Sequence, residues 1–563
     1  MAASDTLFGL PMELVQQILE SLDLNSLKRF RRVSRVANTI SSPIVFQKHT
    51  VKIHSGESSG GTYSWGGALP LPDEDEGDDG EDRQMRINLS TLAKLDQMET
   101  LSNLDFLFDN VQDLNLVQYF PITIPGWGGR KATLKDHVLT FQKFLTGFKS
   151  LKTLRWNLPP GSMNSVLDLS SISSQVTELE IMGRNKGKYV ATGSEAFPEI
   201  FHVFKNLKTL DMHVTDETKL TSFNTLPHLK TFSLELCYNS DLSFVDFFKA
   251  QTVPFNLTSL SLKFGQVPTP FPTDLIPKFL SKLRTLHLHS LSRCDTSPTE
   301  SSTDPIWHGL QQHNVALTEI STDKITPALI SYMASYASTV TTLFVRAPSY
   351  DCTYVATFGE YRTWHEKMHQ LMRDFWTDGV SRHTTSLKSL ILMPGSIYGP
   401  TPRDTIFTPE QVEMAEQMDT VEAWCVGSHM LCAADTVVRC KSLRELGMGS
   451  SAKNGLFEFI ELAGKIGGLE KVGYCYKGYS EKPVMMGWCG TGMFHFYQEQ
   501  RDMKRAAGVL RWKVDEADEK KWERMEVDLV PIGQYRFVRV EEDSKTWKLD
   551  FEEQLASTLP SII

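Results

Sequence analysis

Two short groups of histidine and cysteine residues have spacings that could hold a metal ion. His365 and His369 stand four residues apart in WHEKMHQ, so a helix would place both imidazoles on one face. Cys425, His429 and Cys432 lie similarly close together in CVGSHMLC. Without a third ligand, a histidine pair is more often a surface feature than a zinc site, and the apolar neighbours of the cysteines are typical of buried thiols. The sequence therefore predicts no metal site and no cofactor.

Nucleotide and nucleic-acid binding have little support in the sequence. No GxGxxG follows a predicted strand, and no GxxxxGK[ST] occurs. The formal net charge is −10, whereas a general nucleic-acid-binding protein needs a basic face. Eight acids lie in the ten residues Asp73–Asp82, and without them the net charge is −2. The absence of such motifs leads us to expect a protein without enzymatic activity; an enzyme with its site in an insertion or in the C-terminal region is the alternative.

The cysteines and the hydropathy of the chain bear on its compartment. The eight cysteines form no CxxC pair, and a chain of 563 residues does not need disulfides to fold, so free thiols are expected. The first residues carry no basic leader, and no run of about 18 apolar residues is present. These features predict a cytoplasmic or nuclear protein with no secretory signal and no membrane span.

A pattern of the form L-x-x-L-x-L recurs along the middle of the chain. Copies begin at Leu151, Val176, Leu207, Leu229, Leu257, Leu283, Leu317, Val340, Leu387, Leu443 and Leu469, with an earlier one at Val111. Each copy predicts a short strand whose alternate residues face inward, and helix-like segments such as PKFLSKL near Pro277 lie between copies. The pattern predicts a leucine-rich-repeat solenoid with a parallel sheet on its concave side and helices on its convex side. An ordinary α/β domain is the alternative.

Two long gaps in the repeat spacing predict insertions near residues 348–383 and 394–438. The first contains an amphipathic helix within 357–379, and the second contains a plausible helix start at Thr408-Pro409. The apolar stripe of the first helix is Trp364, Met368, Leu371, Met372 and Phe375. Insertions in solenoids often emerge on the binding face. We expect the stripe to pack on the repeats, with exposure for a partner as the alternative.

The first fifty residues predict three short helices. Leu10, Leu14, Ile18, Leu19 and Leu22 recur at close to helical spacing. A second helix fits residues 25–33, and a third fits residues 34–40 and would end before Pro43. Residues 54–84 are rich in Gly, Ser, Pro and acids, and this composition predicts a disordered linker.

These N-terminal residues resemble an F-box. The family pattern Leu-Pro-x-Glu-Leu is matched by Leu10, Pro11, Glu13 and Leu14, and the sequence continues with Ile18, Leu19, Leu22, the stretch Leu24–Phe30, Val33-Ser34-Arg35, Pro43 and Phe46. One departure is Ala37, which stands where the family commonly has Trp. An F-box followed by leucine-rich repeats is also a family architecture. The resemblance implies a substrate-recognition subunit of a Skp–cullin–F-box ubiquitin ligase, with a Skp-type adaptor, and through it a cullin, as partners.

Physical reasoning agrees with an adaptor-binding surface, because a three-helix unit of this size cannot cover its own apolar face. The residues expected to bind the adaptor are Leu10, Pro11, Glu13, Leu14, Ile18, Leu22, Leu27 and Val33. Two alternatives are open: these residues pack on the solenoid instead, or the chain is a scaffold with a degenerate F-box that acts outside any ligase.

The predicted organisation has four parts. Residues 1–50 form the F-box, residues 51–100 an acidic disordered linker and lead-in, residues 101–480 the solenoid, and residues 481–563 a C-terminal cap. A target protein would bind outward residues of the concave strands. The candidates are Arg155, Asp211, Arg284, His287, Lys388 and Arg444. Several are basic, which would suit an acidic or phosphorylated target.

Overall fold

The structure of the chain is a computed structural model, and it falls into two compact units, Met1–Asn256 and Leu257–Ile563, which are described separately. The residues described are 14–15, 18–19, 22, 24–31, 33, 36–37, 40–41, 44, 48–54, 84–88, 109, 111–119, 145–157, 170–182, 203–214, 226–236, 256–264, 273–290, 303–346, 367, 370–393, 436–450, 455–476, 510–514, 518–530, 533–540 and 545–553.

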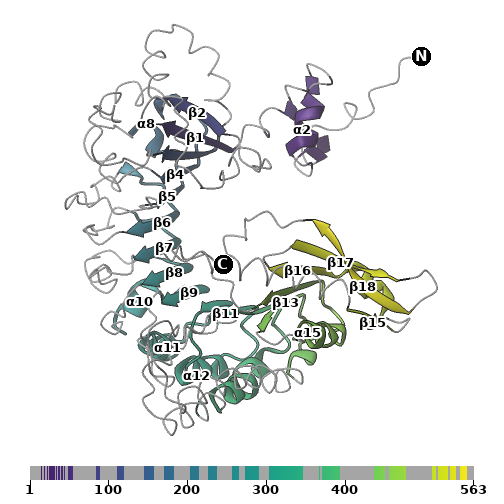
Figure 1. The fold of residues 1–563 in the computed structure, drawn as a ribbon. Helices are drawn as coiled ribbons and strands as arrows, with labels where there is room; N and C mark the ends of the chain where they lie inside the picture. The colour runs from purple at the N-terminus through teal and green to yellow at the C-terminus, as the bar shows by residue number, and fades with distance from the viewer. Residues whose placement is uncertain are drawn as a thin grey trace, which may run out of the picture. The chain divides into compact units, whose positions relative to one another are not determined.

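The first unit contains a parallel sheet and a small helical part (Figure 1). Its helices include α2 (Leu24–Arg31) and α8 (Ser170–Ser173). Its strands are β1 (Lys48–His54), β2 (Gln84–Asn88), β3 (Asp113–Tyr119), β4 (Thr153–Asn157), β5 (Glu178–Met182), β6 (Thr209–Val214) and β7 (Thr231–Leu236). All pairings are parallel, in the order β2-β1-β3-β4-β5-β6-β7. The strands expected at the repeat copies of this unit are therefore adjacent in the sheet.

The sheet begins earlier in the chain than the repeat pattern predicts. Strand β1 crosses the expected boundary at residue 50, and β2 lies within 51–100, which we expected to be linker and lead-in. In β1, Val51 and Ile53 alternate with polar residues but lack the leucine three positions earlier that marks the repeats. Strand β1 pairs with β3, and the paired residues Lys48 and Asp113 are 65 positions apart in the sequence. The residues of β1 alone do not indicate such a distant pairing.

The second unit, taken by itself, also contains parallel strands, and it ends in antiparallel strands (Figure 1). Its parallel strands are β8 (Ser259–Phe264), β9 (Thr285–Ser290), β10 (Glu319–Thr322), β11 (Thr342–Arg346), β12 (Ser389–Met393), β13 (Glu445–Ser450), β14 (Lys471–Tyr476) and β16 (Glu526–Val530). They pair in this order. Strands β17 (Gly533–Arg539), β18 (Thr546–Glu553) and β15 (Trp512–Lys513) then follow in antiparallel pairings. They lie in the region 481–563 that we expect to act as a cap.

Successive copies of the repeat are joined in the same way. Numbering each copy from its first leucine, positions 1 and 4 are buried, as in Leu151 and Leu154. The backbone carbonyl of position 2 accepts two backbone N–H groups from the next copy: that of Lys152 accepts from Thr177 at 2.8 Å and from Glu178 at 3.0 Å. The same pair of bonds recurs at later copies, for example at Arg444. This repetition is consistent with a repeat solenoid.

Helices between the strands pack behind the sheet of the second unit. They are α10 (Leu275–Phe279), α11 (Asp304–Gln312), α12 (Pro327–Ser335), α15 (Gly455–Gly464) and α17 (Glu519–Arg524). In the first insertion, Leu371 and Phe375 are buried, and Phe375 opens a π-helical turn, η5 (Phe375–Gly379), followed by a 3-10 turn, η6 (Val380–His383). Met372 is half-buried, and Trp364 and Met368 lie outside the described residues. The described part of the stripe thus packs on the repeats.

The end of α15 is held by the C-terminal region. Lys521 on α17 donates hydrogen bonds from Nζ to the carbonyls of Ala463 at 3.2 Å and Gly464 at 2.5 Å. A Cβ atom at Gly464 would lie 2.8 Å from the ring of Trp522, so this close approach needs glycine. A cation at a helix C-terminus is also favoured by the helix dipole.

The second insertion, near residues 394–438, lies outside the described residues except for residues 436–438.

The buried side chain of His383 connects the end of the first insertion to α12 and to Val340, the first residue of the preceding copy. Its Nε2 atom donates to the carbonyl of Met333 at 3.1 Å, and its Nδ1 atom accepts from the amide of Val340 at 3.3 Å. This pattern needs the neutral imidazole, because a protonated ring could not accept from Val340. Burial lowers the pKa of His383, although the hydrogen bond to Met333 opposes the shift.

We expect His383 to make folding pH-dependent. The unfolded histidine titrates near 6.5 and the folded one below it, so between these pKa values the unfolded state binds more protons. The contribution of His383 to stability is therefore present above the unfolded pKa and is lost as the pH falls below it. Urea midpoints measured from about pH 7.5 to about pH 5 should fall less in His383→Gln than in the intact protein. Exposed His308→Gln is the control, and identical pH profiles for all three proteins would contradict the prediction.

Candidate functional site

The N-terminal helical part has a small core of its own. Val15, Leu19 and Leu27 are buried together, and Phe30, Ile40 and Ile44 pack against them half-buried. Because Val15 and Leu19 are four residues apart, they lie on one face of a helix that continues the local sequence pattern. This core fixes which of the neighbouring apolar residues remain outside.

A second apolar face of the same part is exposed to solvent. Leu14 is 46% exposed, Ile18 40% and Leu22 37%. Leu14 and Ile18 are helical and four residues apart, so they share one helical face, and Leu22 follows in a bend. Val33 and Val36 are also exposed, at 72% and 54%. Five large apolar side chains on so small a part is the arrangement of a protein-binding surface. We call Leu14, Ile18, Leu22, Val33 and Val36 the apolar face.

Some of the expected adaptor-binding residues are exposed in the structure, and one is buried. Leu14, Ile18, Leu22 and Val33 lie on the apolar face, whereas Leu27 is only 4% exposed and lies in the core. The expectation for Leu27 needs correction, because its side chain is covered by its own helices and leaves almost no surface for a partner. The expected residues Leu10, Pro11 and Glu13 lie outside the described residues. Val36, which is not among the expected residues, is also apolar and exposed.

The comparison with known families decides what this helical part is. Residues 7–47 match the F-box domain. No curated protein matches the chain. The match covers the apolar face and the core of the F-box domain, and it also contains Ala37. The Ala37 side chain is fully buried, so a bulky residue there would need space that this F-box domain has closed.

In the first unit, the predicted target-binding residues Arg155 and Asp211 lie among charged side chains of neighbouring strands. The Nη2 atom of Arg155 on β4 lies 3.0 Å from Oδ2 of Asp113 on β3, and its Nε atom lies 3.4 Å from Oε2 of Glu180 on β5. Asp211 stands opposite Glu180 on the next strand. The strand face described here therefore carries more carboxylates than basic groups, and Arg155 is already engaged by two of them. The acidic or phosphorylated target suggested by the basic candidates therefore has little support on this part of the strand face.

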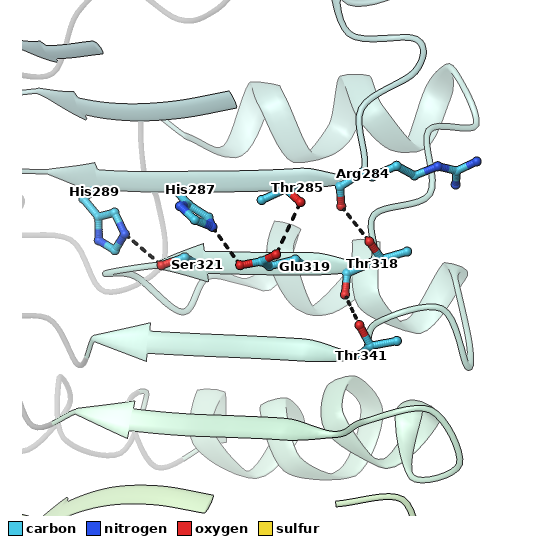
Figure 2. A network of polar contacts seen from close by, with 8 residues as sticks. All are labelled: Arg284, Thr285, His287, His289, Thr318, Glu319, Ser321 and Thr341. Carbon is cyan, nitrogen blue, oxygen red and sulfur yellow. Dashed lines mark hydrogen bonds and ion pairs between the residues drawn. The ribbon is translucent and has the colours of Figure 1, made fainter. Parts of the chain in front are cut away.

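In the second unit, His287 is the predicted strand residue that meets other polar side chains (Figure 2). Its Nε2 atom lies 3.2 Å from Glu319 on β10, and Thr285 donates to the same carboxylate at 3.4 Å. Two residues further along β9, the Nε2 atom of His289 lies 2.8 Å from the hydroxyl of Ser321. The hydrogen bond from His287 lowers the pKa of Glu319, and burial opposes the shift. The arrangement is a half-buried polar surface along β9 and β10 that can exchange hydrogen bonds with a partner.

Arg284, Lys388 and Arg444 do not lie on the strand face. Each directly precedes a strand, at the edge of the sheet where the strands begin. Arg284 donates to the carbonyl of Ala316 at 3.2 Å, and Arg444 donates to that of Gly468 at 2.9 Å. Each guanidinium group thus binds the residue that directly precedes the next copy. Lys388 is exposed. The structure separates these three from Arg155, Asp211 and His287.

His365 and His369 flank Glu366, so HEKMH has the HExxH spacing in which two histidines bind zinc and the glutamate is the general base. These residues lie outside the described residues, as do Cys425, His429 and Cys432. In the described part of the chain, no group of three or more His, Cys, Asp or Glu side chains could hold a metal. Within that same part, no helix combines the length and the apolar composition needed to span a bilayer.

Proposed function

We propose that the chain is a substrate-recognition subunit of a Skp–cullin–F-box ubiquitin ligase. The observation that supports this most is the apolar face of the F-box domain, in which Leu14, Ile18 and Leu22 are exposed to solvent. Large exposed apolar patches mark protein-binding sites, and F-box domains typically bind Skp-type adaptors. The adaptor would cover this face and connect the chain to a cullin. The core Val15, Leu19 and Leu27 would hold the face in place.

The remainder of the chain would bind the target protein. We propose that the repeats are leucine-rich repeats, since the copies share buried positions 1 and 4 and the paired bonds at position 2. The polar strand surface around His287, Glu319 and His289 is the best-supported contact area in the second unit. The chain itself would perform no chemistry, and it would act by raising the concentration of the target near the transferring enzyme, in the cytoplasm or nucleus.

The test is complex formation between the purified full chain and a purified Skp-type adaptor. Size-exclusion chromatography with light scattering should show a complex of one adaptor per chain, and a cullin added afterwards should join it. A chain that lacks residues 1–47 should elute alone. Failure of the folded full chain to bind the adaptor at micromolar concentration would overturn the ligase proposal and favour a scaffold that acts outside any ligase.

The HEKMH segment favours a specific second candidate, a zinc-dependent hydrolase. The two candidates differ in metal content. A receptor should contain no stoichiometric zinc after purification without added metal, whereas the hydrolase should contain one zinc per chain and lose it in His365→Ala. Elemental analysis of the intact protein and of this variant distinguishes them.

A further inference from the structure

Two glutamates on the strand face of the second unit are held in the same way. Glu319 on β10 and Glu445 on β13 both occupy position 3 of their copies. Thr285, at position 3 of the preceding copy, donates to the carboxylate of Glu319 at 3.4 Å (Figure 2). Ser389, at the equivalent position before Glu445, donates to that carboxylate at 2.8 Å. Each carboxylate is therefore oriented by a hydroxyl of the neighbouring strand.

Both carboxylates are accessible to a partner. The exposed fraction is 38% for the side chain of Glu319 and 36% for that of Glu445. The hydrogen bond from His287 lowers the pKa of Glu319, although burial opposes the shift, so this carboxyl group is ionised at neutral pH. The Nζ atom of Lys471 on β14 lies 4.0 Å from Oε1 of Glu445, and such exposed pairs contribute little. Each carboxylate can therefore accept further hydrogen bonds from a cationic group.

The strand face between the two glutamates is apolar and lacks basic side chains. Among the described residues at positions 3 and 5 of β9–β13, none is a lysine or an arginine. On the two strands between the glutamates, position 5 is occupied by Phe344 on β11 and Ile391 on β12. Ile391 is half-buried and leans toward β13, because a Cβ atom at Gly447 would lie 2.9 Å from its Cγ2 atom. A complementary partner is therefore cationic at two points and apolar between them.

The distance between the glutamates matches the repeat of an extended peptide. Glu319, Thr342, Ser389 and Glu445 are register partners on successive strands, so three strand spacings, about 14 Å, separate the two glutamates. An extended segment that crosses the strands advances about 3.4 Å per residue, so four residues also cover about 14 Å. Residues i, i+2 and i+4 of such a segment project to the same side. Residues i and i+4 would then meet the two glutamates, while residue i+2 faces Ile391.

We propose that the strand face of β10–β13 binds an extended segment of the target protein with basic residues at i and i+4 and an apolar residue at i+2. The two basic side chains bind Glu319 and Glu445, and the apolar side chain covers Ile391. This inference rests on the proposed target-binding role of the repeats, and it names the class of segment that they bind. An acidic or phosphorylated segment is repelled by the same two carboxylates.

The first experiment measures the binding of labelled peptides to the full chain by fluorescence anisotropy. The probe contains Lys-Ala-Phe-Ala-Lys, and the two controls contain Glu-Ala-Phe-Ala-Glu and the rearranged Lys-Lys-Ala-Phe-Ala. The probe should bind at least about tenfold more tightly than either control, a modest factor because half-exposed ion pairs are individually weak. Equal affinity for the probe and the acidic control would overturn the proposal. Equal affinity for the probe and the rearranged peptide would overturn the contact at two glutamates.

The second experiment compares variants that carry the same change in charge. Glu319→Gln/Glu445→Gln should bind the probe about tenfold more weakly than the intact chain, because both ion pairs are lost. Glu461→Gln/Glu523→Gln is the matched control, since it neutralises two exposed acids on α15 and α17, and it should bind the probe as the intact chain does.

Reversing the two charges gives a third comparison. Glu319→Lys/Glu445→Lys should bind the acidic peptide more tightly than the probe. Equal probe affinity for Glu319→Gln/Glu445→Gln and its matched control would contradict the proposal. Circular dichroism checks folding, and the glutamine pair decides if the lysine pair does not fold. Adaptor binding is measured on the same samples, so that failure of the ligase proposal is told apart from failure of this one.

Discussion

Replacing Leu14 and Ile18 together by aspartate is expected to weaken adaptor binding by at least about 100-fold without unfolding the F-box domain, which corresponds to about 2.7 kcal/mol. The two residues are 46% and 40% exposed in the isolated chain, so polar replacements there should change its own stability by less than about 1 kcal/mol. Once the adaptor covers the face, two carboxylates would be buried without partners, and such burial is strongly unfavourable. Isothermal titration with the purified adaptor measures the effect.

Two matched variants separate binding from folding in this experiment. Val540→Asp changes an apolar residue that is 41% exposed in the C-terminal region, and it should leave adaptor affinity unchanged. Leu19→Asp changes a core residue of the F-box domain and should unfold that domain, so binding is lost together with its helical signal. If the Leu14→Asp/Ile18→Asp protein binds the adaptor as tightly as the intact chain, the apolar face is not the docking surface.

Trp307→Ala is expected to destabilise the second unit by about 3–5 kcal/mol, the range found for removing a fully buried large aromatic side chain. Trp307 on α11 is completely buried, and its ring lies 5.5 Å from that of Tyr332 on α12. The Tyr332 hydroxyl accepts from the amide of Leu317 at 2.8 Å and donates to the carbonyl of Val315 at 2.8 Å. A cavity beside this tyrosine would therefore loosen both helices and the segment that leads into β10.

Urea unfolding followed by circular dichroism gives the change in free energy for Trp307→Ala. Hydrogen exchange measured by mass spectrometry should show faster exchange in residues 303–346, which hold α11, β10 and α12, and not in the F-box domain. His308→Ala is the matched control, because His308 is the next residue on the same helix and is exposed. Equal midpoints for Trp307→Ala and His308→Ala would contradict this account of the packing.

Much of the parallel sheet could be predicted from the sequence, because its signal is local and repeated. Leucines at positions 1 and 4 alternate with polar residues over a few positions, and the same pattern returns at related spacing. Leu154 and Leu179 are buried on adjacent copies, as that pattern requires. Strands β1 and β2 were not predicted, because their membership in the sheet depends on pairing with distant residues and not on their own sequence.

In the F-box domain, too, the sequence predicts the motif but not which residues are buried. Its match at residues 7–47 follows a sequence motif, but the motif does not say which apolar residues face a partner. Leu14 and Leu19 both fit a helical spacing, yet Leu14 is exposed and Leu19 is buried. Leu27 is covered by packing against Val15 and Leu19. Burial depends on how helices are placed against each other, which no single helical pattern contains.

The sequence by itself determined the repeat, the positions of its buried leucines and the presence of the F-box motif, because each depends on residue types a few positions apart in the chain. Only the tertiary structure decided how the predicted binding residues are distributed. It placed His287 in a polar network on the strand face, engaged Arg155 with acids on both neighbouring strands, and set Lys388 at the edge of the sheet. The reason is that residues of different copies become neighbours only when the strands pair, and charge and burial are properties of those neighbours.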